Sequence, residues 1–324
     1  MHAIRIHDTG GADVLRYEEI LLPAPGRGEV RVRHEAAGVN YIDIYHRAGL
    51  YPLPGLPSGL GVEAAGVVET VGEGVTSVAE GDRVAYVTSL PGCYAEARNV
   101  SADLLLRLPE GIGTETAAAV MLKGLTAEYL IRRAFRVEPG MTVLFHAAAG
   151  GVGLIACQWL AHLGATVIGT VGSEEKARTA RAHGCAHPIV YTEEDFVGRV
   201  GELTGGQGVP VVYDSVGRAT FERSLDCLAR RGTLVAFGNA SGTPDPLDAL
   251  VLAQKGSLYL TRPSLFDYIA SREDLEASAE ALFAAVASGI VRPAIHHRRP
   301  LAEAAQAHRD LETRRTTGST ILVP

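Results

Sequence analysis

The sequence is poor in cysteine, lysine and tryptophan, and it lacks long apolar runs. Its four cysteines lie far apart, so no C-x-x-C pair is available to hold zinc or to carry out dithiol chemistry. No apolar run approaches the roughly 20 residues that cross a bilayer, and the first residues lack the layout of a signal peptide. These absences predict a cytoplasmic protein that does not contact a membrane and whose reduced cysteines pack in its core.

The chain also lacks an excess of basic residues, because its formal net charge is −7. This charge argues against nucleic acid as the principal partner, since binding a polyanion draws on a basic surface. The only lysines are Lys123, Lys176 and Lys255. With 324 residues the chain is long enough for two domains.

A strand, a glycine turn and the start of a helix follow one another between Thr142 and Cys157. This order suits a pyrophosphate, because glycines let the backbone approach the anion and the N–H groups of the first helical turn point at it. Two registers fit the dinucleotide fingerprint, Ala148-x-Gly150-x-x-Gly153 and Gly151-x-Gly153-x-x-Ala156. A similar spacing over residues 59–64 lacks a preceding apolar strand.

Short apolar runs alternate with helix-compatible segments downstream of the glycine turn. Two of the segments that separate the runs are 174–183 and 219–230. Such alternation implies parallel strands joined by right-handed crossovers, hence a six-stranded doubly wound Rossmann sheet. The five further strands are expected at residues 166–171, 188–191, 209–214, 232–238 and 257–261.

Residues before about 124 have a different character, with short strands and frequent glycine turns. Residues 30–34, for example, alternate apolar and charged side chains, which predicts a half-buried strand. We expect a mainly antiparallel, barrel-like domain here. Residues 114–133 predict a helix interrupted near Gly124, 272–288 a further helix and 321–323 a terminal strand.

The sequence resembles the zinc-free quinone oxidoreductase (zeta-crystallin-like) branch of the medium-chain dehydrogenase/reductase superfamily, and is especially similar to bacterial NADPH-dependent quinone oxidoreductases. The motifs that carry the resemblance span nearly the whole chain: AAGVNYID (36–43), GLYP (49–52), GVEAAG (61–66), VGEGV (71–75), GDRV (81–84), KGLT (123–126), HAAAGGVG (146–153), VYDSVG (212–217), FGN (237–239), TRP (261–263) and the tail 314–324.

The resemblance implies a GroES-like, mainly β catalytic domain combined with a Rossmann cofactor domain. The expected boundaries are 1–124 for the first part of the catalytic domain, 125–261 for the NADPH-binding domain and 262–324 for the return to the catalytic domain. It also implies a homodimer formed through the nucleotide domains and a small-molecule quinone as substrate.

The chain departs from the zinc-dependent branch of the superfamily at its metal ligands. Zinc alcohol dehydrogenases place a cysteine where this chain has Asn40, and a Gly-His-Glu motif where it has Gly61-Val62-Glu63. The four-cysteine lobe for structural zinc is absent after Tyr94. We therefore expect no metal, and a conjugated quinone suits such a site better than an alcohol, because its ring delocalises the charge that hydride addition creates.

The end of the second Rossmann strand favours NADPH over NADH. NAD-selective sites usually place Asp or Glu there, whereas this strand runs into Gly172 and Ser173. Ser173 can donate a hydrogen bond to a 2′-phosphate, Lys176 can supply positive charge and Tyr191 can close the pocket. The neighbouring carboxylates of residues 174–175 leave the degree of preference open.

The resemblance implies cofactor contacts beyond the glycine turn, at the ends of the later strands. With those above, the expected cofactor-binding residues are Thr126, Ala148, Gly150, Gly151, Val152, Gly153, Gly172, Ser173, Lys176, Tyr191, Ser215, Gly217, Phe237, Asn239, Arg262 and Arg314.

The resemblance places the residues expected to act in the chemistry, Asn40, Tyr45 and Tyr51, around the open face of the nicotinamide. Asn40 can donate to a quinone oxygen as charge develops, and either phenol can hydrogen-bond to the ring or stack on it. Positioning is expected rather than acid–base catalysis; the alternative is that both tyrosines are packing residues of a mobile loop. His146 is expected to be a hydrogen-bonded core residue without a Ser/Asp constellation.

Two other functions are also compatible with the sequence. One is an NADPH-dependent reductase of α,β-unsaturated aldehydes or ketones, and the other is a protein that binds NADPH or RNA without turnover.

Overall fold

The structure is a computed structural model that describes all residues from 1 to 324. The chain divides into two compact units. The first contains Met1–Leu125, Ile269–Ala287 and Pro293–Pro324, and the second contains Thr126–Tyr268 and Ser288–Arg292. None of its helices combines the length and the apolar character that crossing a membrane would require.

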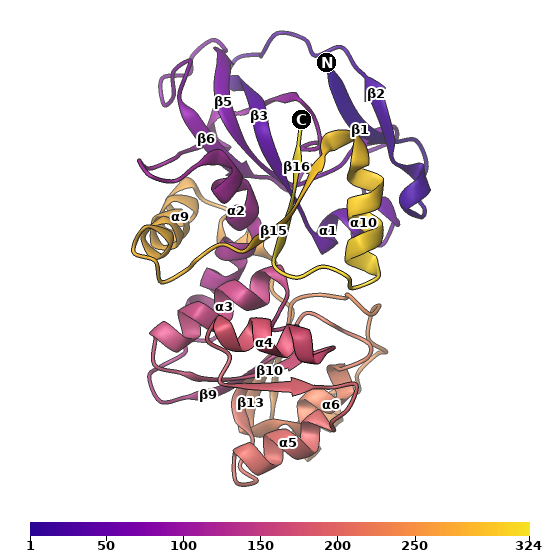
Figure 1. The fold of residues 1–324 in the computed structure, drawn as a ribbon, viewed down its shortest axis with the longest axis vertical. Helices are drawn as coiled ribbons and strands as arrows, with labels where there is room; N and C mark the ends of the chain where they lie inside the picture. The colour runs from indigo at the N-terminus through magenta and orange to yellow at the C-terminus, as the bar shows by residue number, and fades with distance from the viewer. The chain divides into compact units, whose positions relative to one another are not determined.

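A seven-stranded sheet forms the centre of the first unit (Figure 1). Its pairs are antiparallel except for β15 and β16. The order is β15 (Ile295–Pro300), β16 (Ser319–Val323), β3 (Glu29–Val39), β5 (Glu63–Val71), β6 (Arg83–Val87) and β8 (Leu106–Arg107), with β7 (Ala97–Ser101) paired to β3. A three-stranded sheet accompanies it, in the order β2 (Arg16–Glu19), β1 (His2–Ile6) and β4 (Ser58–Gly59).

Strands β3 and β5 make a close backbone approach at Gly66. A Cβ atom at this position would lie 2.0 Å from the carbonyl oxygen of Arg33. The pairing shifts register next to this point, between His34 and Ala36. Glycine therefore permits the bend in the sheet, as glycines inside strands often do.

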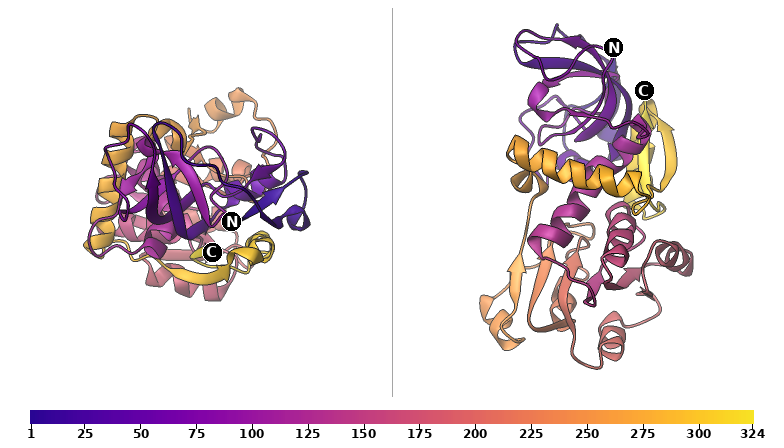
Figure 2. Two further views of the ribbon diagram at one scale, coloured as in Figure 1. Left: turned by 90° about the horizontal axis from the view of Figure 1, so that it is seen from above. Right: turned by 90° about the vertical axis from the view of Figure 1, so that its left-hand side faces the viewer.

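Four helices belong wholly or mainly to the first unit. They are α1 (Tyr41–Arg47), α2 (Thr114–Tyr129), α9 (Arg272–Ala287) and α10 (Ala304–Glu312), with short 3₁₀ turns at Ala12–Val14, Ala102–Leu104 and Leu301–Glu303. In both views of Figure 2 the yellow C-terminal segment lies beside the indigo N-terminal segment, in agreement with the pairing of β16 to β3.

The expected interruption of the second helix near Gly124 is wrong, because α2 runs through that residue and continues into a π-helical turn at Leu130–Ala134. A Cβ atom at Gly124 would lie 2.4 Å from a side-chain carbon of Leu282 in α9. The glycine thus permits close helix packing instead of ending the helix. Sequence alone does not distinguish these two uses of glycine.

The second unit has a six-stranded parallel sheet in the order β11-β10-β9-β12-β13-β14. The predicted doubly wound Rossmann fold is confirmed. The strands are β9 (Thr142–Phe145), β10 (Thr166–Val171), β11 (His187–Val190), β12 (Val209–Asp214), β13 (Leu228–Ala236) and β14 (Tyr259–Thr261). The helices are α3 (Gly151–His162), α4 (Glu174–Ala182), α5 (Phe196–Leu203), α6 (Phe221–Asp226), α7 (Ala249–Gln254) and α8 (Leu265–Tyr268).

Two further details of the prediction are wrong. The helix expected over 219–230 ends at Asp226, because Cys227 and Leu228 are buried in the core and Leu228 already pairs with Val209 as the start of β13. Packing here overrides helix propensity. Strand β15 and helix α10 were not predicted, since the histidines and arginines of β15 give little apolar alternation.

Candidate functional site

The glycine turn of the second unit joins β9 to α3. Gly150 is the N-cap of α3, and Gly151 is its first residue. A Cβ atom at Gly153 would lie 2.4 Å from the carbonyl oxygen of Ala147 and 2.8 Å from the backbone of Ala148, so only glycine fits. The structure thus brings residues 148–153 together at a helix N-terminus, where a phosphate is stabilised by N–H groups and the helix dipole.

A second group lies beyond the end of β10. Ser173 is the N-cap of α4, and its Oγ accepts a hydrogen bond from the Lys176 backbone nitrogen at 3.3 Å. A Cβ atom at Gly172 would come within 2.9 Å of the Tyr191 hydroxyl, so the phenol lies against this glycine. Neither position 172 nor position 173 is an acidic residue, so no carboxylate at these two positions would repel an anionic group at the end of β10.

A third group gathers at the ends of β12 and β13. Asp214 accepts hydrogen bonds from the backbone nitrogens of Val216 at 2.8 Å and Gly217 at 3.0 Å. Gly217 has φ +87°, and a Cβ there would lie 2.6 Å from the Gly242 carbonyl oxygen. The loop that carries Ser215 is thereby fixed.

The remaining expected residues of the second unit lie close to this loop. The Phe237 ring is centred 5.9 Å from that of Phe145, and Arg262 donates a hydrogen bond to the Ala236 carbonyl oxygen at 3.1 Å. A Cβ at Gly217 would lie 3.1 Å from the Cα of Asn239. Because the carboxyl ends of parallel strands share one edge of the sheet, these residues and the glycine turn all lie at the edge where such sheets bind ligands.

Two expected cofactor residues do not belong to the glycine turn or to the loops after the strands of the second unit. Thr126 is half-buried in α2, and Arg314 is exposed after α10 with φ +58°. Arg314 belongs to the first unit, whereas all the other expected cofactor residues belong to the second.

His146 is fully buried at the end of β9, as expected of a core residue. The expectation that no serine and aspartate accompany it is wrong. Its Nε2 lies 3.0 Å from the Ser224 Oγ, which donates to Asp214 at 2.9 Å, and its Nδ1 lies 2.8 Å from the Thr170 Oγ1. All four residues are buried, and desolvation lowers the pKa of His146 although Asp214 opposes this. The group therefore stabilises the loop after β12 and is closed to substrates.

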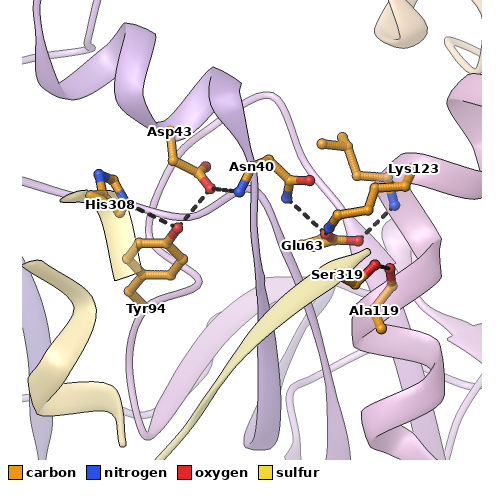
Figure 3. A network of polar contacts seen from close by, with 9 residues as sticks. Asn40, Asp43, Glu63, Tyr94, Ala119, Lys123, His308 and Ser319 are labelled. Atoms are coloured by element: carbon orange, nitrogen blue, oxygen red, sulfur yellow. Dashed lines mark hydrogen bonds and ion pairs between the residues drawn. The ribbon is translucent and has the colours of Figure 1, made fainter. Parts of the chain in front are cut away.

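In the first unit, three donors converge on the carboxylate of Glu63 (Figure 3). Its Oε1 accepts from the Asn40 Nδ2 at 2.7 Å and from the Lys123 Nζ at 2.9 Å, and its Oε2 accepts from the Leu122 backbone nitrogen at 2.7 Å. The side chain of Glu63 is 0% exposed and that of Lys123 is 6% exposed. A Cβ at Gly38 would lie 2.0 Å from the Glu63 Oε1, so glycine makes room for the carboxylate.

Glu63 and Lys123 were not among the predicted site residues. Both lie in motifs that carried the family resemblance, and Lys123 is one of only three lysines. The signal that could have found them is the requirement that a charge in an otherwise apolar segment be paired once it is buried. The 60 residues that separate the two hide this pairing in the sequence.

A second chain of hydrogen bonds begins at the Asn40 backbone nitrogen, which donates to the Asp43 Oδ2 at 2.8 Å (Figure 3). The Tyr94 hydroxyl donates to the same oxygen at 2.7 Å. Beyond it, His308 lies with Nε2 3.2 Å from the Tyr94 hydroxyl and Nδ1 3.2 Å from the Arg47 Nη1. Because Arg47 only donates, Nδ1 must accept and Nε2 carries the proton. Each hydrogen bond in this chain therefore has a fixed direction.

Asp43 is the one member of this chain that titrates near neutral pH. Burial raises its pKa to about 7, against the hydrogen bonds from Tyr94 and Asn40 that lower it, and its Oδ1 is buried without a hydrogen-bond partner. Burial and the nearby Arg47 lower the pKa of His308 to about 3, so the imidazole stays neutral.

The two predicted tyrosines lie next to the Asn40 segment. The idea that both belong to a loop is wrong for Tyr45, which is buried in α1. Its ring is centred 5.1 Å from that of Tyr51 in an edge-on arrangement and 6.2 Å from that of Tyr41. No group of three or more His, Cys, Asp or Glu side chains is arranged to hold a metal ion.

Comparisons with known proteins agree with this geometry along the whole chain. Residues 26–139 match the alcohol dehydrogenase GroES-like domain, and residues 151–284 match the zinc-binding dehydrogenase family. The chain is 55% identical to the quinone oxidoreductase of Pseudomonas aeruginosa over 97% of each chain, and 47% identical to a 2-haloacrylate reductase of Burkholderia sp. over 98% of each. The crystal structure of Escherichia coli quinone oxidoreductase complexed with NADPH superposes with a TM-score of 0.98, at 50% identity and with both chains fully covered.

The raised pKa of Asp43 predicts a pH-dependent stability. The folded chain holds this proton more tightly than the unfolded chain, whose ordinary value is 3.8. The contribution of Asp43 to the free energy of unfolding should therefore fall as the pH rises from about 4 to about 7, by roughly 2–3 kcal/mol between pH 5 and pH 8. Buried histidines with lowered pKa values, such as His308, act in the opposite direction in the wild type and in the variant alike, so the Asp43 contribution is the difference between the two proteins. Urea denaturation of the wild type and of Asp43→Asn at both pH values measures this difference.

Asp43→Asn has no proton to lose, so its free energy of unfolding should rise relative to that of the wild type by this amount between pH 5 and pH 8. Asp8→Asn, at an exposed position, is the matched control and should follow the wild type at both pH values. Equal pH dependence in all three proteins would show that Asp43 does not titrate in this range.

Proposed function

Because the chain belongs to the quinone oxidoreductase branch of the medium-chain dehydrogenase/reductase superfamily, we propose that it is an NADPH-dependent quinone reductase. The observation that carries the proposal is the full-length similarity, at 50–55% identity, to proteins named quinone oxidoreductase, one of them crystallised with NADPH. The recognition made from the sequence is confirmed.

The second unit fits NADPH. The turn at Gly150–Gly153 would receive the pyrophosphate at the N-terminus of α3. A Cβ atom at Gly153 would collide with the backbone of the preceding turn, so only glycine allows this geometry. Ser173 and Lys176 would bind the 2′-phosphate at the N-terminus of α4, with Tyr191 packed against Gly172 as one wall. When bound, NADPH supplies the hydride.

Asn40 is the residue that we propose to meet the quinone. An amide N–H can stabilise the negative charge that develops on a quinone oxygen during hydride addition. Tyr45 and Tyr51 would hold the flat ring by stacking or edge contacts. A hydroquinone anion is a weak base, so water completes its protonation and no side chain is required as a proton donor.

The most direct test follows NADPH oxidation against 1,2-naphthoquinone, 1,4-benzoquinone and a simple enone, with metal analysis of the same sample. We expect turnover of the quinones by protein that contains less than about one-tenth equivalent of zinc. The 2-haloacrylate reductase relative supports a second candidate, reduction of an activated carbon–carbon double bond. Preference for the enone would favour that candidate, and tight NADPH binding without any turnover would favour a binding protein.

Lys176→Ala tests the phosphate pocket. Removing the positive charge should weaken NADPH binding by about 10-fold or more while NADH binding changes less than about 2-fold, because a charge-assisted hydrogen bond to the 2′-phosphate is worth roughly 1.5–3 kcal/mol. Titration of both cofactors by fluorescence measures the two constants. Lys255→Ala, which breaks an ion pair with Asp226 elsewhere in the same unit, is the matched control. Equal losses for NADPH and NADH would contradict this assignment of Lys176.

We propose that the chain forms a homodimer through the edge strand β14. Tyr259 is 61% exposed and Leu260 is 38% exposed on this strand, and an apolar edge strand offers unpaired backbone groups to a second copy. Leu260→Arg should give a monomer in sedimentation experiments. Leu90→Arg, at an exposed leucine of the first unit, should leave the dimer intact. A monomeric wild type would exclude this assembly.

We also place the protein in the cytoplasm. All four cysteines are free and buried, as suits a compartment that keeps thiols reduced. Cell fractionation with an antibody against the chain tests the location, and recovery in another fraction would contradict it.

A further inference from the structure

We infer that Glu63 and Lys123 are positioning residues that fix the direction of the Asn40 carboxamide, holding its nitrogen and turning its oxygen away. The inference rests on the proposed function only for its catalytic test. Figure 3 shows the arrangement, with the amide nitrogen of Asn40 directed at Glu63 and the amide oxygen on the other side.

The direction follows from what each group can donate. A carboxamide can turn by half a rotation at little cost, so its orientation is decided by the hydrogen bonds around it. Glu63 already receives hydrogen bonds from Lys123 and from the Leu122 backbone, and an ionised carboxylate can only accept. Asn40 must therefore present its nitrogen to the Glu63 Oε1, at 2.7 Å.

Lys123 allows the carboxylate of Glu63 to be buried in its ionised form. A carboxylate that is 0% exposed needs a compensating charge, and the Lys123 ammonium supplies it from 2.9 Å. The pairing is enclosed, since Lys123 is itself only 6% exposed. The ion pair thus forms a rigid support that holds the Asn40 side chain.

Three elements of the fold position this ion pair. Glu63 begins β5, Lys123 lies in α2, and Gly38 in β3 leaves the space between them, because its Cβ would lie 2.0 Å from the Glu63 Oε1 and 2.4 Å from the Ala118 carbonyl oxygen of α2. The space is too small to admit any side chain at position 38. Asn40, two residues later, lies just beyond the end of β3 as the N-cap of α1, and its side chain is directed at the same carboxylate.

The orientation of the Asn40 amide determines which of its donor and acceptor groups can meet a substrate. With the nitrogen bound to Glu63, the oxygen and the second N–H of Asn40 face the opposite side. Reversing the carboxamide would place a different set of donors and acceptors there. A substrate oxygen that gains negative charge would then meet an altered electrostatic environment.

The variant Glu63→Gln is expected to cause this reversal. The Leu122 N–H still requires an acceptor, so the new amide must place its oxygen there and its NH₂ group towards Asn40 and Lys123. Asn40 then turns its oxygen to the new NH₂ group. Adding Lys123→Met removes the ammonium that this NH₂ group would otherwise face, and leaves a network without charge.

The double variant Glu63→Gln/Lys123→Met separates positioning from stability. Each single change leaves a polar or charged group badly paired, so each should lower the melting temperature more than the double change does. The kcat with 1,2-naphthoquinone should nevertheless differ from the wild-type value by about 10-fold or more in the double variant, because the reversed Asn40 presents its NH₂ group to the acceptor in place of its oxygen. The Kd for NADPH should change by less than about 2-fold, in keeping with a role confined to the acceptor.

A spectroscopic measurement reports on the amide without any turnover. The side-chain ¹⁵N–¹H₂ signal of Asn40, assigned by its disappearance in Asn40→Asp, should show slow exchange with water and a hydrogen-bonded shift in the wild type. Both properties should be lost in Glu63→Gln and in the double variant. The matched control is Glu128→Gln, which alters a buried glutamate whose ion pair with Arg133 is 3.0 Å long; it should leave the Asn40 signal and kcat unchanged.

The inference would be overturned if the double variant kept the wild-type kcat and an unchanged Asn40 signal. It would also be overturned if the activities of all variants simply followed their melting temperatures. If the double variant does not fold, the signal of Glu63→Gln alone decides. Absence of quinone turnover in the wild type would remove the proposed function, while the Asn40 signal would still test the positioning role.

Discussion

A carboxylate that no water reaches must find all its partners within the protein, and this requirement shapes the interior of the first unit. Glu63 meets it with an ammonium, a side-chain amide and a backbone N–H. Strand β3 provides the space by placing Gly38 beside the carboxylate, and helix α2 contributes both Lys123 and the Leu122 nitrogen. The position of Asn40 is thus a consequence of how a buried charge is balanced.

The second unit depends on a constraint of a different kind, the close approach of backbone atoms at two glycines. At Gly153 and Gly217 a Cβ atom would lie within 2.6 Å of a backbone oxygen, so the turns after β9 and β12 can form only with glycine. The buried group of His146, Ser224 and Asp214 then holds the second of these turns in place. Polar groups that resemble catalytic residues in composition therefore serve here as structural support for the loop after β12.

The sequence was sufficient to predict the parallel sheet, because buried strands and glycine turns leave strong local signals. It was insufficient where a residue has its role through a distant partner. Gly124 was interpreted as a helix break because its contact, Leu282, is more than 150 residues away along the chain. Helix α6 was predicted too long because the pairing of Leu228 with Val209 is a tertiary effect. The neighbours of His146 and the pairing of Glu63 with Lys123 were missed for the same reason: neither is close in sequence.

The balance of charge around Asn40 depends on Lys123. At the Gly-His-Glu motif of the zinc-dependent branch, this chain has valine in place of histidine and retains the glutamate. A retained glutamate without a nearby cation would be an uncompensated buried charge, which proteins avoid. Lys123 provides the cation, so Glu63 and Lys123 together contribute no net charge. The carboxyl of Asp43 experiences both, since Glu63 raises its pKa and Lys123 lowers it, while burial has the largest effect and brings the value to about 7. The interior beside Asn40 therefore carries no more than one uncompensated negative charge near neutral pH, and the neutral amide of Asn40 is held there by the ion pair.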